Sequence, residues 1–245
     1  MNKEIASVAE ALADIPDGAK IAVGGFFTAG VPRALLQGLI DKQVKDLTLM
    51  CGSGPLIGAP ELTRQLIENG QIKKVIDSYA LSRSVTKGKD DPLEQAVRAG
   101  DIVLEIVPMG TLAERYRAAG AGIAAFYTPT GGGSRVEEFE INSRPEPSAK
   151  EVRMFDGRPH VLEEALKPDI ALVHAHTGDR EGNLCFRKTA RNFNPVMAMA
   201  AKMTIAEVEN LVEPGEIDPQ QVHTPGVFVK RIVHVGRHLH AVTAL

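Results

Sequence analysis

The sequence is poor in the residues that mark several classes of protein. It lacks tryptophan, and its aromatic residues are three tyrosines and eight phenylalanines among 245 residues. Its only cysteines are Cys51 and Cys185, with no CxxC spacing. A disulfide framework is therefore not predicted, and we expect two small core residues in a reducing compartment.

Long apolar runs and an excess of one charge are also missing. No apolar run approaches the roughly 20 residues that a membrane-spanning helix needs, and residues 1–4 do not resemble a signal peptide. The 28 basic and 31 acidic residues give a formal charge of -3 and form no long run of one sign. We therefore expect a cytoplasmic protein whose partners include neither nucleic acid nor a membrane.

Short apolar runs alternate along the chain with amphipathic segments, which predicts an α/β fold with a mostly parallel sheet and helices on both faces. We expect strands at 20–23, 47–50, 74–76, 102–107, 124–127, 170–173, 204–208 and 227–235. We expect helices at 5–13, 32–40, 59–68, 112–119, 161–166 and 196–201, and one that begins at Pro92. Residues 1–245 are predicted to form one domain, with an exposed polar insertion at about 134–153.

A glycine-rich segment follows the first expected strand. Gly24, Gly25 and Gly30 can adopt positive φ at no steric cost, and Pro32 is suited to the first position of a helix. A strand, a glycine loop and a helix N-terminus together form a typical cradle for an anion. The spacing matches neither the dinucleotide fingerprint nor the lysine-bearing phosphate loop, so a tight turn without a ligand stays an alternative.

Two further loops follow expected strands, at residues 51–55 and 108–111. Ligands of open α/β sheets bind outside the carboxyl ends of the strands. We therefore expect these loops to face the same site as the glycine loop.

The whole segment 17–32 resembles the signature of the alpha (A) subunit of the family I 3-oxoacid coenzyme A transferases. That signature is an Asp-Gly turn, a short strand, Gly-Gly-Phe, three variable residues, Gly, one residue and Pro, and this chain meets every fixed position. Later segments resemble further landmarks of that subunit in the usual order: 110–115, 126–131, 182–184, 192–195 and 223–226.

The resemblance implies a mechanism and a division of labour. A glutamate carboxylate forms an acyl anhydride and then a glutamyl-CoA thioester, and in the family this glutamate lies in the beta subunit, within Ser-Glu-Asn-Gly. This chain is thus expected to supply no catalytic residue, to hold no permanent cofactor or metal, and to form a heterodimer or heterotetramer that uses coenzyme A as substrate. The expected coenzyme A contacts are Gly24, Gly25, Phe26, Phe27, Thr28, Ala29 and Gly30.

The departures from the family pattern bear on which carboxylic acid the enzyme uses as substrate. Gly52 and Ser53 stand in Cys-Gly-Ser-Gly-Pro where Ser-Asn-Asn-Ala-Gly is usual, and Met109 replaces the glutamine of Pro-Gln-Gly-Thr. Residues 80–83 also replace the usual Val-Gly-Glu-Asn. We expect Gly52, Ser53 and Met109 to line the substrate pocket with fewer amide donors, and so to favour a longer or less polar acid than succinate or acetoacetate.

Two other functions stay open at this point. One is a subunit of a CoA-thioester hydrolase of the same fold, which would need an acidic residue near Met109, and the other is a non-catalytic CoA-binding subunit. Methionine cannot act as a general base, which disfavours the hydrolase.

Three groups of residues suggest chemistry that we do not assign to them. Glu68 precedes Asn-Gly as in the beta motif, but it should end a helix with Asn69-Gly70 as a left-handed cap. We expect His174 and His176 to point to opposite faces of a strand, without a third metal ligand at a recognisable spacing. The cluster Arg187, Lys188 and Arg191 would suit either the phosphates of coenzyme A or a solvated surface.

Overall fold

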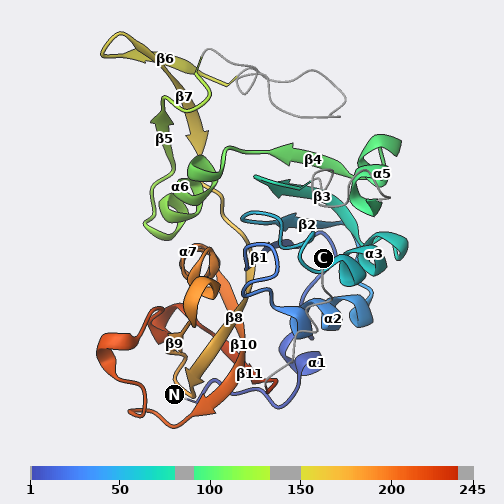
Figure 1. The fold of residues 1–245 in the computed structure, drawn as a ribbon, viewed down its shortest axis with the longest axis vertical. Helices are drawn as coiled ribbons and strands as arrows, with labels where there is room; N and C mark the ends of the chain where they lie inside the picture. The colour runs from blue at the N-terminus through green and yellow to red at the C-terminus, as the bar shows by residue number, and fades with distance from the viewer. Residues whose placement is uncertain (1, 81–90, 133–149, 237–245) are drawn as a thin grey trace.

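The computed structural model describes residues 2–80, 91–132 and 150–236, and these form one large and one small β-sheet (Figure 1). The strands of the large sheet lie in the order β11-β10-β8-β1-β2-β3-β4, with β9 paired to β8. All of its pairs are parallel except β8 with β9. The strands are β1 (Lys20–Val23), β2 (Leu47–Met50), β3 (Ile72–Asp77), β4 (Val103–Ile106), β8 (Ile170–Asp179), β9 (Leu184–Cys185), β10 (Met203–Val212) and β11 (Arg231–His234).

Helices cover both faces of the large sheet, which confirms the predicted fold class. Alternate strand residues point to opposite faces: Ile21 belongs to the core beneath α2, α3 and α5, whereas Ala22 belongs to the core beneath α6 and α7. The helices are α1 (Val8–Ala11), α2 (Arg33–Lys42), α3 (Pro60–Glu68), α5 (Pro92–Ala99), α6 (Met109–Gly120) and α7 (Asn194–Ala200). Three short 3-10 helices complete the described elements: η2 (Lys188–Arg191), η3 (Pro219–Gln221) and η4 (Gly226–Phe228).

The small sheet is antiparallel and projects beyond the end of the large one (Figure 1). It consists of β5 (Ala125–Thr128), β7 (Arg158–Glu164) and β6 (Val152–Phe155). The predicted helix at 161–166 is therefore wrong. Val161 pairs with both Thr128 and Val152 and is fully buried, so the strand pairing outweighs the helical preference of the glutamates and leucines that follow it.

The predicted insertion is described only at its end. Residues 134–149 lie outside the described residues, and β6 begins at Val152, inside the predicted exposed segment. A two-residue turn, Asp156-Gly157, with both residues at positive φ, joins β6 to β7. This is a favoured hairpin turn, so the sequence did carry a signal for this hairpin.

Several predicted boundaries also shift. The helix expected at 5–13 is reduced to the single turn α1, and the helix expected to begin at Leu112 begins at Met109. The expected loop around Met109 is therefore largely the first turn of α6. The helix expected to begin at Pro92 does so, and Asp91 caps it, because its carboxylate accepts the amides of Leu93 and Glu94.

Candidate functional site

Four loops leave the carboxyl ends of neighbouring parallel strands, after β1, β2, β3 and β4. The first two are in direct contact. The amide of Phe27 donates to the carbonyl oxygen of Ser53 at 3.0 Å, and Phe26 forms an isolated bridge with Ser53. The glycine loop, residues 24–30, therefore packs directly against the buried loop at 51–55, as predicted for neighbouring strands of a parallel sheet.

Aromatic side chains join the glycine loop to the loop after β3. The ring of Phe27 lies 5.4 Å from that of Phe26 and 5.5 Å from that of Tyr79, between centroids. Phe27 has φ of +47°, which is unusual for a bulky residue. Its carbonyl oxygen would lie 1.9 Å from a Cβ at Gly58, so the chain can pass there only because position 58 lacks a side chain.

Asn194 fills the space behind the glycine loop. Its side chain donates to the carbonyl oxygens of Gly30 at 3.1 Å and Ala190 at 2.9 Å, and accepts the amide of His174 at 3.1 Å. A Cβ at Gly24 would lie 2.0 Å from Asn194 Oδ1. Gly24 and Gly30 are thus required by packing inside the chain. The sequence does not reveal this packing requirement for glycine, which holds whether or not the loop binds a ligand.

The amino end of α2 already holds an internal anion. The amide of Leu35, in the first turn, donates to Glu207 Oε2 at 3.0 Å, although Glu207 lies on β10. Among the described residues, the amides of Gly25, Thr28 and Gly30 donate no hydrogen bond. Of these three residues only Thr28 is exposed, whereas Gly25 and Gly30 are buried. Glu207 stabilises the helix dipole from inside the protein.

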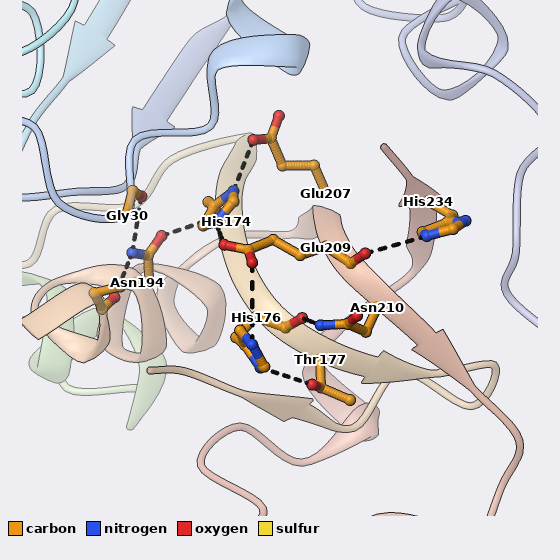
Figure 2. A network of polar contacts seen from close by, with 10 residues as sticks. Gly30, His174, His176, Thr177, Asn194, Glu207, Glu209, Asn210 and His234 are labelled. Atoms are coloured by element: carbon orange, nitrogen blue, oxygen red, sulfur yellow. Dashed lines mark hydrogen bonds and ion pairs between the residues drawn. The ribbon is translucent and has the colours of Figure 1, made fainter. Parts of the chain in front are cut away.

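A buried network connects Glu207 to the rest of the site (Figure 2). Glu207 Oε1 lies 2.8 Å from His174 Nδ1, and Glu209 Oε1 lies 3.3 Å from His174 Nε2. His176 Nε2 lies 4.0 Å from Glu209. The prediction that the two histidines point to opposite faces is wrong, because residues i and i+2 of a strand share a face.

The charge of His174 is set by two opposing effects. Burial lowers its pKa, but the hydrogen bonds and charges of Glu207 and then Glu209 outweigh burial, so the pKa is raised. Among residues 2–80, 91–132 and 150–236, no cluster of three or more histidine, cysteine or acidic side chains is arranged to hold a metal ion. Through its contacts with His174 and with the amide of Leu35, Glu207 connects β10 to β8 and α2.

Asp77 is a site residue that the sequence reasoning missed. It ends β3, is fully buried, and accepts the amides of Gly54, Ser78 and Tyr79. Burial raises its pKa to about 7, although these amide bonds oppose the rise. A polar residue after two buried strand residues was the available signal. Asp77 holds the loops after β2 and β3 against each other.

The three predicted substrate-pocket residues differ in exposure. Ser53 is 1% exposed, and a Cβ at Gly52 would lie 2.4 Å from the ring of Phe193, so neither presents a side chain to solvent. Met109 is 46% exposed at the start of α6. The same helix reaches the loop at 51–55, because Tyr116 donates to the carbonyl oxygen of Cys51 at 3.1 Å. The structure brings Gly52 and Ser53 to the glycine loop and leaves Met109 farther along the same edge. Of residues 80–83, only Ala80 lies within the described residues.

The structure also shows where Glu68 and the cationic cluster lie, to which we assigned no catalytic role. Glu68 ends α3 and so lies toward the amino edge of the sheet, where β3 begins, away from the four loops. Only Gly70 is left-handed in its cap, since Asn69 has helical φ and ψ. Arg187, Lys188 and Arg191 are exposed on and beside η2. None of the described helices is long and apolar enough to cross a membrane.

The mostly parallel sheet, with helices on both faces, is shared with solved coenzyme A transferases. An acyl-CoA transferase from Escherichia coli O157:H7, solved as the apoenzyme, superimposes with a TM-score of 0.81 at 22% identity. The match covers 95% of this chain and 47% of that one, so this chain spans about half the length of that protein.

The family follows from the sequence comparisons. The family model described as coenzyme A transferase matches residues 5–235, and the chain belongs to that family, which confirms the resemblance. It is 47% identical over 232 residues to the A subunit of the succinyl-CoA:3-ketoacid coenzyme A transferase of Xanthomonas campestris pv. campestris, covering 94% of this chain and 88% of the relative. It is 45% identical over 237 residues to the A subunit of the 3-oxoadipate CoA-transferase of Pseudomonas putida, covering 96% and 95%.

Proposed function

We propose that this chain is the alpha subunit of a heteromeric transferase that moves coenzyme A from an acyl-CoA to a free carboxylic acid. The match of residues 5–235 to the family carries the proposal. The names of the relatives support it, because each is the corresponding subunit of an enzyme of this kind. Hydrolysis and a purely non-catalytic role are not favoured, since these relatives are named as transferases.

The proposed chemistry needs a carboxylate, and the described glycine loop (24–30) and the loop at 51–55 contain none. The partner's glutamate attacks the thioester carbonyl, which gives an acyl-glutamyl anhydride and the CoA thiolate. The thiolate then attacks the glutamyl carbonyl, releases the first acid, and leaves a glutamyl-CoA thioester, which the second acid resolves by the reverse steps. Asp77, the carboxylate between the loops, is buried and accepts three amides, so it is held away from a substrate carbonyl.

The contribution of this chain is to bind and position coenzyme A. The free amides of Gly25, Thr28 and Gly30 lie on a loop that packing with Asn194 holds in one conformation. Preorganised amide donors suit an oxygen anion or a polarised carbonyl. A crystal structure of the Escherichia coli neighbour is described as a thioester complex with CoA. Coenzyme A is thus proposed as a substrate here, with no group bound permanently.

Co-expression with the reading frame for the beta subunit tests the proposal. The complex should transfer coenzyme A only when an acceptor acid is present, whereas a hydrolase needs only water and a regulatory subunit gives neither reaction. Incubation with acyl-CoA followed by borohydride should reduce the thioester on the partner chain. Label on Glu68 of this chain would contradict the assignment, and Glu68→Gln should leave activity unchanged. We propose the cytoplasm as the compartment, and fractionation of cells tests that separately.

A further inference from the structure

A group of exposed cations lies beside the glycine loop. Arg187 precedes η2, and Lys188 and Arg191 are its first and last residues. Among the described residues none of the three forms an ion pair. Three like charges within five residues repel one another, so a bound anion would relieve this repulsion.

The same turn packs directly on the glycine loop. Asn192 Nδ2 donates to the carbonyl oxygen of Ala29 at 3.0 Å, and Asn194 Nδ2 bridges the carbonyl oxygens of Gly30 and Ala190. A Cβ at Gly30 would lie 2.9 Å from the carbonyl oxygen of Ala190. The cations are therefore fixed relative to the free amides of the loop rather than carried on an independent surface segment.

Backbone strain also concentrates here. Five described residues other than glycine have positive φ, and Phe27 and Lys188 are two of them. Phenylalanine and lysine gain nothing from this conformation, unlike asparagine or aspartate, and such strain persists only where surrounding contacts impose it. One strained residue lies in the glycine loop and the other in the turn that packs against it.

Among the described residues, no acidic group lies within ion-pair distance of the three cations. His223 accepts the amide of Phe186, and burial followed by the positive charge of Arg191 lowers its pKa, so it adds no charge of either sign near neutral pH. We propose that Arg187, Lys188 and Arg191 form an anion site that binds the phosphate groups at the nucleotide end of coenzyme A. This inference rests on the proposed function, because it assumes that coenzyme A lies on the glycine loop.

Substrates that lack phosphate groups provide the test in the complex with the beta subunit. For Lys188→Gln/Arg191→Gln, we expect the KM for acyl-CoA to rise about three- to tenfold, as for the loss of two exposed charge contacts. The value of kcat should stay within about twofold, because the chemistry lies at the other end of the substrate. The KM for the matching acyl-pantetheine, which lacks every phosphate, should not change. Arg187→Gln should show the same pattern more weakly.

A matched variant controls for the loss of charge alone. Lys73→Gln/Lys167→Gln removes two exposed lysines near the amino ends of β3 and β8, at the opposite edge of the sheet, and should leave every KM unchanged. Acyl-dephospho-CoA lacks only the 3′-phosphate, so its KM shows how much of the rise in KM comes from that group and how much from the diphosphate. An equal rise in KM for acyl-pantetheine would overturn the proposal. Weaker binding of the beta subunit with unchanged KM values would instead assign the cluster to an acidic surface of the partner.

Equilibrium binding keeps this test separate from that of the proposed function. Calorimetry with free coenzyme A and with pantetheine measures the contribution of the phosphates without turnover. In one outcome, the wild-type complex shows no transfer but binds coenzyme A more tightly than pantetheine, and Lys188→Gln/Arg191→Gln loses this difference. The anion site is then supported and the transferase proposal fails. If transfer occurs and the variant keeps the preference, the anion site fails alone.

Discussion

Gly24 shows why a glycine in a candidate ligand loop needs a structure to explain it. A Cβ at this position would lie 2.0 Å from Asn194 Oδ1 and 3.1 Å from the carbonyl oxygen of Leu172. Gly24→Ala should therefore displace Asn194, which holds Gly30, Ala190 and His174. We expect a loss of about 1–3 kcal/mol in the free energy of unfolding, from denaturant titration of the complex, and a rise in KM for acyl-CoA.

Gly110 offers a matched control for that substitution. A Cβ there would meet no atom within 4 Å, and its φ is not positive. Gly110→Ala lies in the first turn of α6 and should leave stability unchanged or slightly higher. Equal losses from both substitutions would show that Gly24 is not required by contact with Asn194.

Asp77 gives the site a predictable response to pH. Its pKa rises from 3.8 to about 7 on burial, so the folded protein favours the protonated form relative to the unfolded chain. The contribution of Asp77 to stability is therefore present below about pH 4, falls as pH rises from 4 to 7, and is constant above that. A pKa rise of this size corresponds to a fall on the order of 4 kcal/mol. The asparagine of Asp77→Asn has no titratable proton in this range, so this variant should lack the fall in stability.

Denaturant titrations of the complex between pH 4 and 8 measure this effect. The difference in unfolding free energy between wild type and Asp77→Asn should change with pH. The same difference for Asp101→Asn, which replaces an exposed aspartate, should be small and flat. A flat difference for Asp77→Asn as well would mean that Asp77 is ionised throughout this range.

Elements far apart in the sequence are joined by Glu207. Its carboxylate contacts His174 on β8 and the amide of Leu35 in α2, while it lies on β10 and is 1% exposed. Removal of one partner from a buried, hydrogen-bonded ion pair costs about 3–5 kcal/mol. Glu207→Gln keeps the shape of the side chain but loses the charge, so we expect a loss of about 2–3 kcal/mol in the same unfolding assay.

The pH dependence identifies His174 as the partner. Since its pKa is raised in the fold, the pair stabilises the protein below the ordinary pKa of histidine, and this contribution is lost as pH rises through the raised pKa. NMR titration of the His174 ring should show a larger fall in its pKa in Glu207→Gln than in Glu209→Gln, because Glu209 is 3.3 Å away and more exposed. Equal falls would contradict the leading role of Glu207.

Among the secondary-structure elements, the sequence predicted the strands of the parallel sheet better than those of the antiparallel sheet. Strands such as β1 and β2 are short, mostly apolar runs with three of their four residues buried, and their type is clear from local sequence. β7 has only Val161 and Glu163 buried, and its partner β5 lies on the far side of the predicted insertion in the chain. Such a strand takes its conformation from tertiary pairing, which a local pattern cannot report.

For the whole molecule, the same distinction applies to the site. The carboxyl edge follows from the order of parallel strands, so the meeting of the glycine loop with the loop at 51–55 was predictable. The roles of Asn194 and Glu207 were not, because each acts on a residue more than 150 positions away. The family resemblance supplied the expected partner and chemistry, and the structure supplied the contacts that hold the loops.

The choice of acid is a property of the whole complex, and Met109 is the residue of this chain best placed to influence it. Of the three predicted pocket residues it alone presents an exposed side chain, and the parallel sheet places it on the same edge as the loops. An amide at position 109 would offer a donor to a polar acid, and sites with hydrogen-bond donors discriminate strongly. Met109→Gln should therefore raise kcat/KM for succinate relative to hexanoate, by roughly tenfold.

Steady-state assays of the reconstituted complex measure this ratio. Met154→Gln, which replaces an exposed methionine on β6, is the matched control and should leave the ratio unchanged. The wild-type complex should not prefer succinate and acetoacetate above all other acids by a wide margin, and such a preference would contradict the hypothesis directly. A ratio that Met109→Gln leaves unchanged would show that the groups selecting the acid come from the beta subunit, because Gly52 and Ser53 expose no side chain that could replace Met109 in this role.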